Sequence, residues 1–175
     1  MTGKTLLSPQ FEKMAPAGDD RARDVCGHCG FVDYQNPKIV VGSVASSGGR
    51  ILLCRRAIEP RLGFWTLPAG YLELGESAED GARREAWEEA RAHLSIDQTL
   101  AVYSVPRISQ VQIMFRATLR QPDFAAGPES LEVALFAYEE IPWAELAFPT
   151  VSWALRHWRE VEGREAFPAF SNPPD

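Results

Sequence analysis

The chain has 175 residues, of which 45% are apolar and 24% charged, and its formal net charge is -6 at pH 7. A chain of this size can bury one core with a small appendage, and its acidic balance excludes a general nucleic-acid-binding surface. No apolar run reaches the length of a membrane span and no basic-then-apolar leader opens the chain, so we expect a cytoplasmic protein that binds no membrane. An anionic small molecule remains compatible, because it needs only a local basic pocket.

The N-terminal segment is polar and interrupted by Gly and Pro as far as about residue 24, which predicts a mobile or loosely docked arm. Cys26 and Cys29 follow in CGHCG, and two thiolates separated by two residues can hold one tetrahedral zinc ion. A complete site needs a second pair, and the remaining cysteine, Cys54, stands alone in an apolar stretch typical of a core strand. We favour a knuckle-shaped turn without metal. The alternative is a zinc ion completed by His28 or by another subunit.

The rest of the chain contains strands and helices in a mixed order. Strands are predicted at 38–46, 50–56, 64–67, 99–105, 111–119 and 131–138, and two late helices at 143–146 and 150–162. With a further helix between the third and fourth strands, these elements build an α/β fold, a mixed β-sheet flanked by helices in an α/β/α sandwich. We expect a small knuckle-like N-terminal segment at 1–36, a main domain at 37–162 and a C-terminal tail at 163–175.

The helix between the third and fourth strands has well-defined start signals. Ser77 is its predicted N-cap, with Asp80 three residues later in a capping-box-like position. Small residues then recur at every fourth position: Ala78, Ala82, Ala86 and Ala90. This alanine stripe lets the helix lie close against a sheet. The loop before the helix contains Gly70 and Gly75, which allow the backbone to approach a phosphate or a metal closely.

Three carboxylates share a neighbouring face of this helix. Glu85, Glu88 and Glu89 stand at i, i+3 and i+4, within an arc of about 100°. Like charges at this spacing destabilise a bare helix, but they become useful when a divalent cation lies among them. Mg²⁺ takes oxygen ligands and shares its coordination between carboxylates and substrate phosphates. The pattern therefore predicts a magnesium site.

The stretch that contains these carboxylates, GYLELGESAEDGARREAWEEARA, resembles the Nudix box. That box reads Gly, five residues, Glu, seven residues, Arg-Glu, an apolar residue, any residue, Glu-Glu, any residue, Gly and an apolar residue. Its six site positions are matched by Gly70, Glu76, Arg84, Glu85, Glu88 and Glu89. The closing Gly, a common left-handed helix terminator, is replaced by Arg91, and Ala92 takes the last apolar position.

The resemblance extends beyond the box to the Nudix hydrolases that carry an N-terminal zinc ribbon and cleave FAD or ADP-ribose. The similar segments are CGHCGFVDYQNPKIVVGSVA, ILLCRRAIEPRLGFWTLPAGYLELGES and GPESLEVALFAYEEIPWAELAF, within about residues 24–162. The chain lacks the first CxxC pair of that subgroup. It also lacks the Ser-Gln-Pro-Trp-Pro-Phe-Pro signature of the related NADH pyrophosphatases, which disfavours NADH as the substrate.

The resemblance implies a Nudix-type fold and Mg²⁺-dependent hydrolysis, with Mn²⁺ as a substitute, of a nucleoside diphosphate linked to another moiety, FAD or ADP-ribose. The implied metal ligands are Glu85, Glu88, Glu89 and Glu76, the last directly or through water. Glu89 or Glu88 would be the base, and Arg84 would hold a neighbouring carboxylate in place.

Residues outside the box are assigned with alternatives. Glu129 and Glu132 would add a carboxylate from a facing loop or, equally, belong to a surface turn before a strand. Gly70 would contact the substrate. Trp65, Tyr71 and Phe148 could stack on a base or flavin ring, although aromatic residues in such strands more often belong to the core.

Other functions remain open at this point. One is a nucleotide-sensing, non-hydrolytic Nudix-like regulator, against which the intact carboxylate set argues. Another is a nucleic-acid-binding knuckle protein, which the lack of a basic stripe near Cys26 and Cys29 disfavours. Among enzymes, a nucleoside triphosphate or NADH pyrophosphatase is the alternative. We expect a small nucleotide as the partner, no nucleic acid, and a homodimer as one option for the assembly.

Overall fold

The computed structural model describes residues 10–174 of the chain. The chain divides into two compact units, residues 1–36 and residues 37–175. Within residues 10–174, no helix is long and apolar enough to cross a membrane.

The N-terminal unit is a small antiparallel sheet with the strand order β1-β2-β3. Its strands are β1 (Phe11–Met14), β2 (Arg23–Cys26) and β3 (Val32–Asp33). Residues 10–24 of the predicted mobile or loosely docked arm contain regular structure, because β1 pairs with β2 from Phe11 opposite Cys26 to Met14 opposite Arg23. All four residues of β1 are exposed, so it shows no alternation of apolar and polar side chains that would identify a strand. Residues 1–9 of that arm lie outside the described residues.

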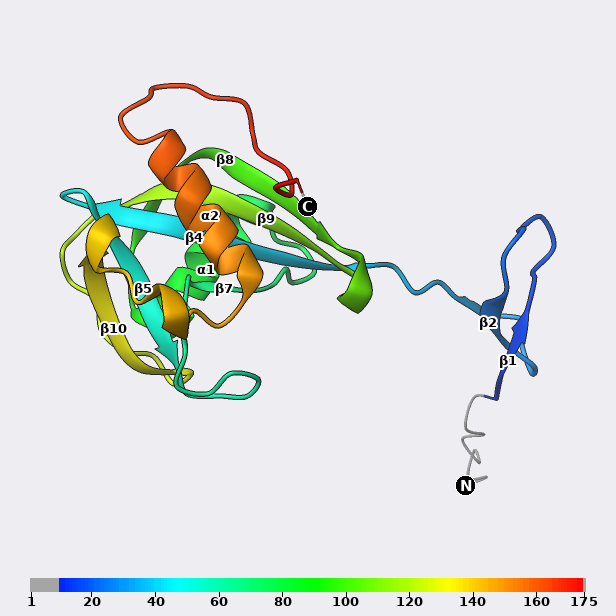
Figure 1. The fold of residues 1–175 in the computed structure, drawn as a ribbon. Coiled ribbons are helices and arrows are strands. Elements are labelled where there is room, and N and C mark those ends of the chain that lie inside the picture. The colour runs from blue at the N-terminus through cyan, green and yellow to red at the C-terminus, as the bar shows by residue number, and fades with distance from the viewer. Residues whose placement is uncertain (1–9, 175) are drawn as a thin grey trace. The chain divides into compact units, whose positions relative to one another are not determined.

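The second unit contains a mixed sheet (Figure 1). Its strands are β4 (Lys38–Ser47), β5 (Arg50–Arg56), β6 (Trp65–Thr66), β7 (Ala69–Tyr71), β8 (Leu94–Val105), β9 (Gln110–Leu119) and β10 (Ser130–Ala137). The main path runs β10-β5-β4-β9-β8, with β6 beside β5 and β7 beside β4. The pair of β4 and β9 is parallel and the other pairs are antiparallel, which confirms the predicted mixed sheet.

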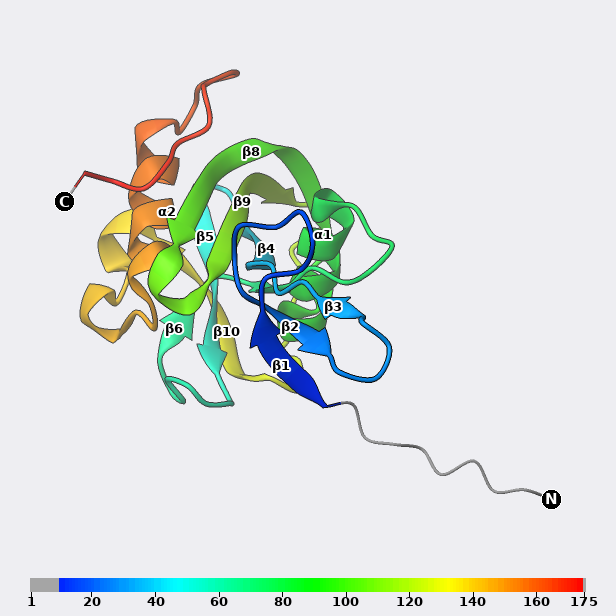
Figure 2. The same ribbon diagram turned by 90° about the vertical axis from the view of Figure 1, so that its right-hand side faces the viewer.

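Two α-helices cover opposite faces of this sheet, as Figures 1 and 2 show. They are α1 (Ala78–Ala90) and α2 (Pro149–Glu160), and the short 3-10 turns are η1 (Pro106–Ile108), η2 (Tyr138–Glu140) and η3 (Trp143–Glu145). The predicted α/β/α sandwich is confirmed. The predicted helix at 143–146 is only the single turn η3.

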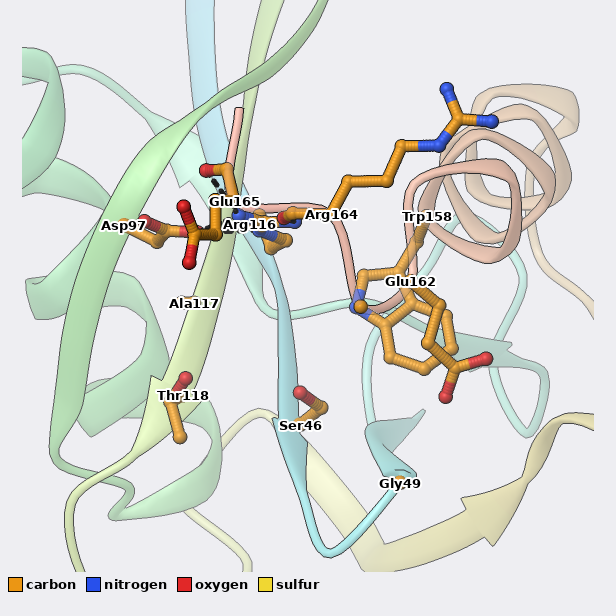
Figure 3. Close-up of a pocket in the computed structure, with 11 residues that line it drawn as sticks. Ser46, Gly49, Asp97, Arg116, Ala117, Thr118, Trp158, Glu162, Arg164 and Glu165 are labelled. Carbon is orange, nitrogen blue, oxygen red and sulfur yellow. Dashed lines mark hydrogen bonds and ion pairs between the residues drawn. The ribbon is translucent and has the colours of Figure 1, made fainter. Parts of the chain in front are cut away.

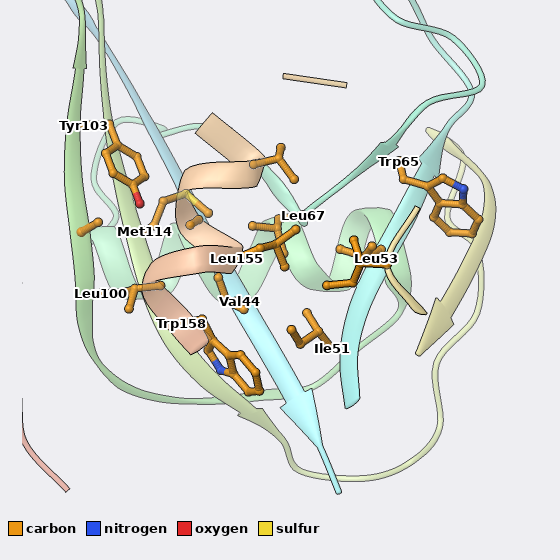
Figure 4. Packing of buried hydrophobic residues seen from close by; sticks show 14 of the residues in the cluster. Val44, Ile51, Leu53, Trp65, Leu67, Leu100, Tyr103, Met114, Leu155 and Trp158 are labelled. Carbon is orange, nitrogen blue, oxygen red and sulfur yellow. The ribbon is translucent and has the colours of Figure 1, made fainter. Parts of the chain in front are cut away.

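Both helices pack on the same central strands, because successive side chains of a strand point to opposite faces of the sheet. Val44, Ile51 and Leu53 pack with Leu155 and Trp158 of α2 in one core (Figure 4). On the other face, a second core contains the alternate residues Ala45, Leu52 and Cys54 with Ala86 and Ala90 of α1. Cys54 is thus a buried core residue, as predicted.

The ends of α1 follow from local hydrogen bonding. Ser77 is the N-cap, and its Oγ accepts a hydrogen bond from the backbone N–H of Asp80 at 3.1 Å, as predicted. Arg91 adopts the left-handed conformation, with φ of 51°, at the position where the Nudix box has Gly. Its N–H bonds to the carbonyls of Ala86 and Trp87, so the helix still ends there without the glycine.

The segment predicted as a tail, residues 163–174, packs against the second unit. Its Phe170 exchanges backbone hydrogen bonds with β8, from its N–H to Leu100 and from Val102 to its carbonyl, both at 2.9 Å. Its ring stacks on His157 of α2, with the centroids 4.1 Å apart. One edge of the sheet is therefore covered locally by the C-terminal segment.

Candidate active site

Glu85 lies directly over the backbone of Gly70. A Cβ placed on Gly70 would come within 2.4 Å of Cδ and both carboxylate oxygens of Glu85. Gly70 belongs to β7, which pairs with β4, so the sheet holds the strand in place beside the helix. Glycine is needed here for close approach, since any side chain would displace the carboxylate. Burial is the main cause that raises the pKa of Glu85.

Glu89, one turn further along α1, is also buried, with 7% of its surface exposed. One of its carboxylate oxygens accepts a hydrogen bond from the N–H of Ala69 at 3.2 Å. Burial raises its pKa to about 8, and the nearby charge of Glu85 adds to this shift, while Ala69 opposes it. Two buried carboxylates one helical turn apart form a strongly negative site when both are ionised.

Arg84 binds the carboxylates of the box together. Its Nη1 donates to Glu85 at 2.6 Å and to Glu88 at 2.9 Å. Its Nη2 donates to Glu76 at 2.8 Å and to the carbonyl of Tyr71 at 2.9 Å. These charge-assisted bonds raise the pKa of Arg84, chiefly through Glu76, and fix the orientation of the carboxylates that it contacts.

Glu76 is held at both oxygens. Arg84 Nε also donates to it at 3.1 Å, and the backbone N–H of Glu73 donates at 2.7 Å. The hydrogen bonds from Arg84, followed by that from Glu73, lower the pKa of Glu76 to about 2. Glu76 therefore orients Arg84 in this structure, and its direct use as a metal ligand would require it to release the guanidinium.

The chemistry of the donors fits Mg²⁺, because the site combines hard carboxylate oxygens with a glycine cradle that leaves room for the buried carboxylate of Glu85. As the side chains stand, no group of three or more His, Cys, Asp or Glu residues within 10–174 converges to hold a metal ion. Arg84 is bonded to Glu85 and Glu88 instead. Exposed Glu88 can turn away from Arg84 by rotating its side chain, which would free a third carboxylate.

The facing loop contributes Glu129 rather than Glu132 to this electrostatic cluster. The charge of Glu129 raises the pKa of both Glu85 and Glu89. Glu132 is exposed and lies 3.6 Å from Nη1 of Arg55, with which it forms an ion pair. The electrostatic effect of Glu129 on both residues favours the alternative in which the facing loop adds a carboxylate to the site.

Arg56 is a candidate site residue that the sequence did not indicate. Its charge lowers the pKa of Glu89, its Nε donates to the carbonyl of Pro60 at 2.8 Å, and its guanidinium lies 5.3 Å from the ring centroid of Phe148. A cation at the rim of a carboxylate cluster is suited to hold a phosphate. The only signal in the sequence is the second Arg of ILLCRR, which reads equally well as the polar end of a strand.

The predicted aromatic contacts divide into different environments. Trp65 is buried in the core and packs edge-to-face on Phe136 at 4.9 Å, so its ring is not open to a ligand. Tyr71 is 48% exposed, beneath Lys38 at 5.0 Å. Phe148 is half-buried under Arg56. The predicted stacking of a base or flavin ring on Trp65 is therefore wrong. Tyr71 and Phe148 remain candidates for such stacking.

The cysteine pair of the N-terminal unit forms a turn, in which the N–H of Gly30 donates to the carbonyl of Cys26 at 2.9 Å. Cys26 is buried and Cys29 is exposed. Backbone N–H groups of His28 and Cys29, directed at the sulfur, lower the pKa of Cys26. Residues 10–174 supply no third ligand from His, Cys, Asp or Glu to this pair, so they do not fit a complete zinc site within one chain.

Hollows elsewhere on the second unit contain none of the predicted site residues. One, of about 400 Å³, surrounds Arg116 (Figure 3). That guanidinium donates to Asp97, to the carbonyl of Val161 at 3.1 Å and to that of Arg164 at 2.7 Å. These bonds tie the turn after α2 to the sheet, which accounts for the polar groups of this hollow.

A mixed sheet with a carboxylate-bearing helix after a glycine strand is the arrangement of a Nudix hydrolase, and the comparisons agree. A model of the NUDIX domain matches residues 36–158, and a zinc-ribbon model described as Nudix N-terminal matches residues 9–35. The chain belongs to the Nudix hydrolase family and is an enzyme of that family.

Similar proteins include a MutT-like protein of Streptomyces ambofaciens, 31% identical over 136 residues (74% of this chain and 86% of that protein). An ADP-ribose pyrophosphatase of Methanocaldococcus jannaschii is 30% identical over 119 residues (66% and 69%). The crystal structure of a NUDIX hydrolase from Nitrosomonas europaea is 42% identical, with a TM-score of 0.88, over 98% of this chain and 99% of that one.

Proposed function

We propose that the enzyme hydrolyses the diphosphate of a nucleoside diphosphate linked to another moiety, with ADP-ribose or FAD as the substrate. The observation that carries this proposal is the pair of buried carboxylates beside the glycine strand, Glu85 bonded to Arg84 and Glu89 bonded to the N–H of Ala69. The similar ADP-ribose pyrophosphatase supports the choice of ADP-ribose, and FAD rests on the resemblance in sequence alone.

Glu85, Glu88 and Glu89 would hold Mg²⁺, or Mn²⁺ in its place. When bound, the metal would neutralise the diphosphate and lower the pKa of an attacking water. Arg56 would hold a phosphate oxygen at the rim of the cluster, and Arg84 would keep Glu85 in its orientation. Glu88, Glu89 or Glu129 would take the proton from water, since each is a carboxylate in or beside the cluster.

The substrate is tested by chromatography of the products formed from ADP-ribose, FAD, NADH and 8-oxo-dGTP with Mg²⁺. We expect AMP and ribose 5-phosphate from ADP-ribose, and AMP and FMN from FAD. A value of kcat/KM for a triphosphate or NADH more than about tenfold above both substrates, about 1.4 kcal/mol in transition-state binding, would overturn the substrate class. The metal site would still stand.

The catalytic assignment is tested by comparing Glu89→Gln with Glu79→Gln on the same helix. Glu79 is exposed and outside the box, so its variant controls for the loss of one negative charge. We expect Glu89→Gln to lower kcat by about 10²-fold or more with the fold intact, and Glu79→Gln to change little. Equal activity of the two variants would contradict the assignment of Glu89 as a catalytic residue.

The proposal includes a cytoplasmic location and a small nucleotide as the only class of partner besides the metal. A homodimer is the assembly to test by light scattering.

A further inference from the structure

The last turn of α1 is closed by a segment that is distant in sequence. A helix leaves its final carbonyls without partners inside the helix. The N–H of Gly127 donates to the carbonyl of Glu89, and the N–H of Ala125 donates to that of Ala90, both at 2.9 Å. The loop between β9 and β10 thus binds the end of the helix that carries the carboxylates.

Gly127 is where this loop approaches the helix most closely. A Cβ built there would lie 1.7 Å from the carbonyl oxygen of Glu88 and 2.8 Å from its carbonyl carbon. Gly127 is buried, and its φ is not positive, so glycine is required for space and not for backbone conformation. Any side chain would move the loop or the helix.

The same loop carries Glu129 two residues later. A tight turn follows Gly127, in which the N–H of Ser130 donates to the carbonyl of Gly127 at 3.1 Å. The carbonyl of Glu129 then accepts from the N–H of Ala57 at 2.8 Å. Between these two attachments, the backbone of Glu129 is held at a set distance from that of Glu89, and its exposed side chain extends from this fixed point.

We propose that Gly127 is a positioning residue, which sets the distance between Glu129 and the carboxylates of α1 by fastening the loop to the carbonyl of Glu89. This inference rests on the proposed function for its catalytic consequence, because Glu129 matters to hydrolysis only if the cluster binds metal and substrate. The structural part of the inference is that Gly127 places a carboxylate near a metal site. Metal affinity tests that part without substrate.

The test is a double-mutant cycle of Gly127→Ala and Glu129→Gln, read as Mn²⁺ affinity from the electron paramagnetic resonance of free Mn²⁺ and as kcat. If Gly127 acts through Glu129, each single variant weakens Mn²⁺ binding by about fivefold and lowers kcat by about tenfold or more. The double variant is then no worse than the stronger single variant by more than about twofold. Additive losses would overturn the proposal, because they would show that Gly127 affects the site independently of Glu129.

Gly163→Ala is the matched control. Gly163 follows α2 in the chain, lines the hollow around Arg116 that contains none of the box carboxylates, and has a φ of +74°, so an alanine there is strained but apart from the site. It should lower the melting temperature and leave Mn²⁺ affinity unchanged. If Gly127→Ala does not fold, Pro128→Gly loosens the same turn without adding atoms, and the cycle with Glu129→Gln is repeated on it.

The outcomes separate this inference from the proposed function. Coupled Mn²⁺ losses in a protein that hydrolyses no diphosphate would support the positioning and overturn the function. Additive losses in an active enzyme would overturn the positioning role and support the proposed function. A wild-type protein that binds no Mn²⁺ would overturn both.

Discussion

The hydroxyl of Tyr103 lies 2.7 Å from Nδ1 of His157, within the core beneath α2. Burial lowers the pKa of His157, with Glu160 opposing the shift. The folded state therefore binds a proton on this ring less readily than the unfolded state does. Stability is complete above the unfolded pKa of about 6.5 and is lost as the pH falls from there to the lower folded pKa.

We expect the free energy of unfolding of the wild type to fall more between pH 7.5 and pH 5.5 than that of His157→Gln does. Urea denaturation at the two pH values measures this difference. His93→Gln changes an exposed histidine and should retain the wild-type slope. Equal slopes for the wild type and His157→Gln would show that protonation of this ring does not destabilise the fold.

Gly70→Ala should inactivate the enzyme through Glu85. The new methyl would overlap the carboxylate, so Glu85 must turn away from the position it shares with Arg84. We expect kcat to fall by about 10²-fold or more while circular dichroism stays native. Gly27→Ala, where a Cβ meets nothing closer than 3.7 Å, is the control and should be fully active. A fully active Gly70→Ala protein would show that the position of Glu85 does not matter.

Glu89→Gln should stabilise the metal-free protein at alkaline pH. Because burial raises the folded pKa of Glu89 to about 8, above its unfolded value of about 4.5, the wild type loses stability as the pH rises between these values. We expect the variant to exceed the wild type by on the order of 1–3 kcal/mol at pH 8 in chelator, and by less at pH 5. Mg²⁺ should stabilise the wild type more than the variant, and a gap that narrows towards pH 8 would refute this reasoning.

Zinc should be substoichiometric or held between subunits, since Cys26 and Cys29 supply half of a tetrahedral thiolate site. Elemental analysis of the chelator-washed protein should find well below one zinc per chain. The melting temperature of Cys26→Ser should then respond to chelator no differently from that of the wild type. One tightly bound zinc in a monomeric chain would reveal ligands that the described residues do not show, with His28 and the N-terminal residues the first to examine.

Much of the fold could be predicted because local pattern and final structure agree. Strands β4 and β5 are apolar runs separated by a glycine turn, and α1 combines an N-cap with a stripe of alanines. Strand β7 was missed because its three residues look like a loop, and only pairing with β4 makes them a strand. The hairpin of β1 was missed for the same reason, as its register with β2 is a long-range property.

The candidate site likewise has a part that the local sequence predicts and a part that depends on long-range contacts. Spacing on one helix identified Glu85, Glu88 and Glu89, because the period of a helix is fixed. The role of Gly70 as a cradle, the contact of Ala69 with Glu89 and the presence of Arg56 depend on segments brought together by the sheet. No spacing within one element encodes such contacts.

The parallel pairing of β4 with β9 has a consequence for biosynthesis. A nascent chain emerges from the ribosome N-terminus first, and β4 is complete long before β9, which ends at Leu119. The central pair of the sheet therefore cannot form while α1 is being made, and the loop that closes the helix follows later still. Co-translational folding of this unit must wait for its C-terminal half, so translational pausing before β9 would leave the alanine face of α1 open to chaperones.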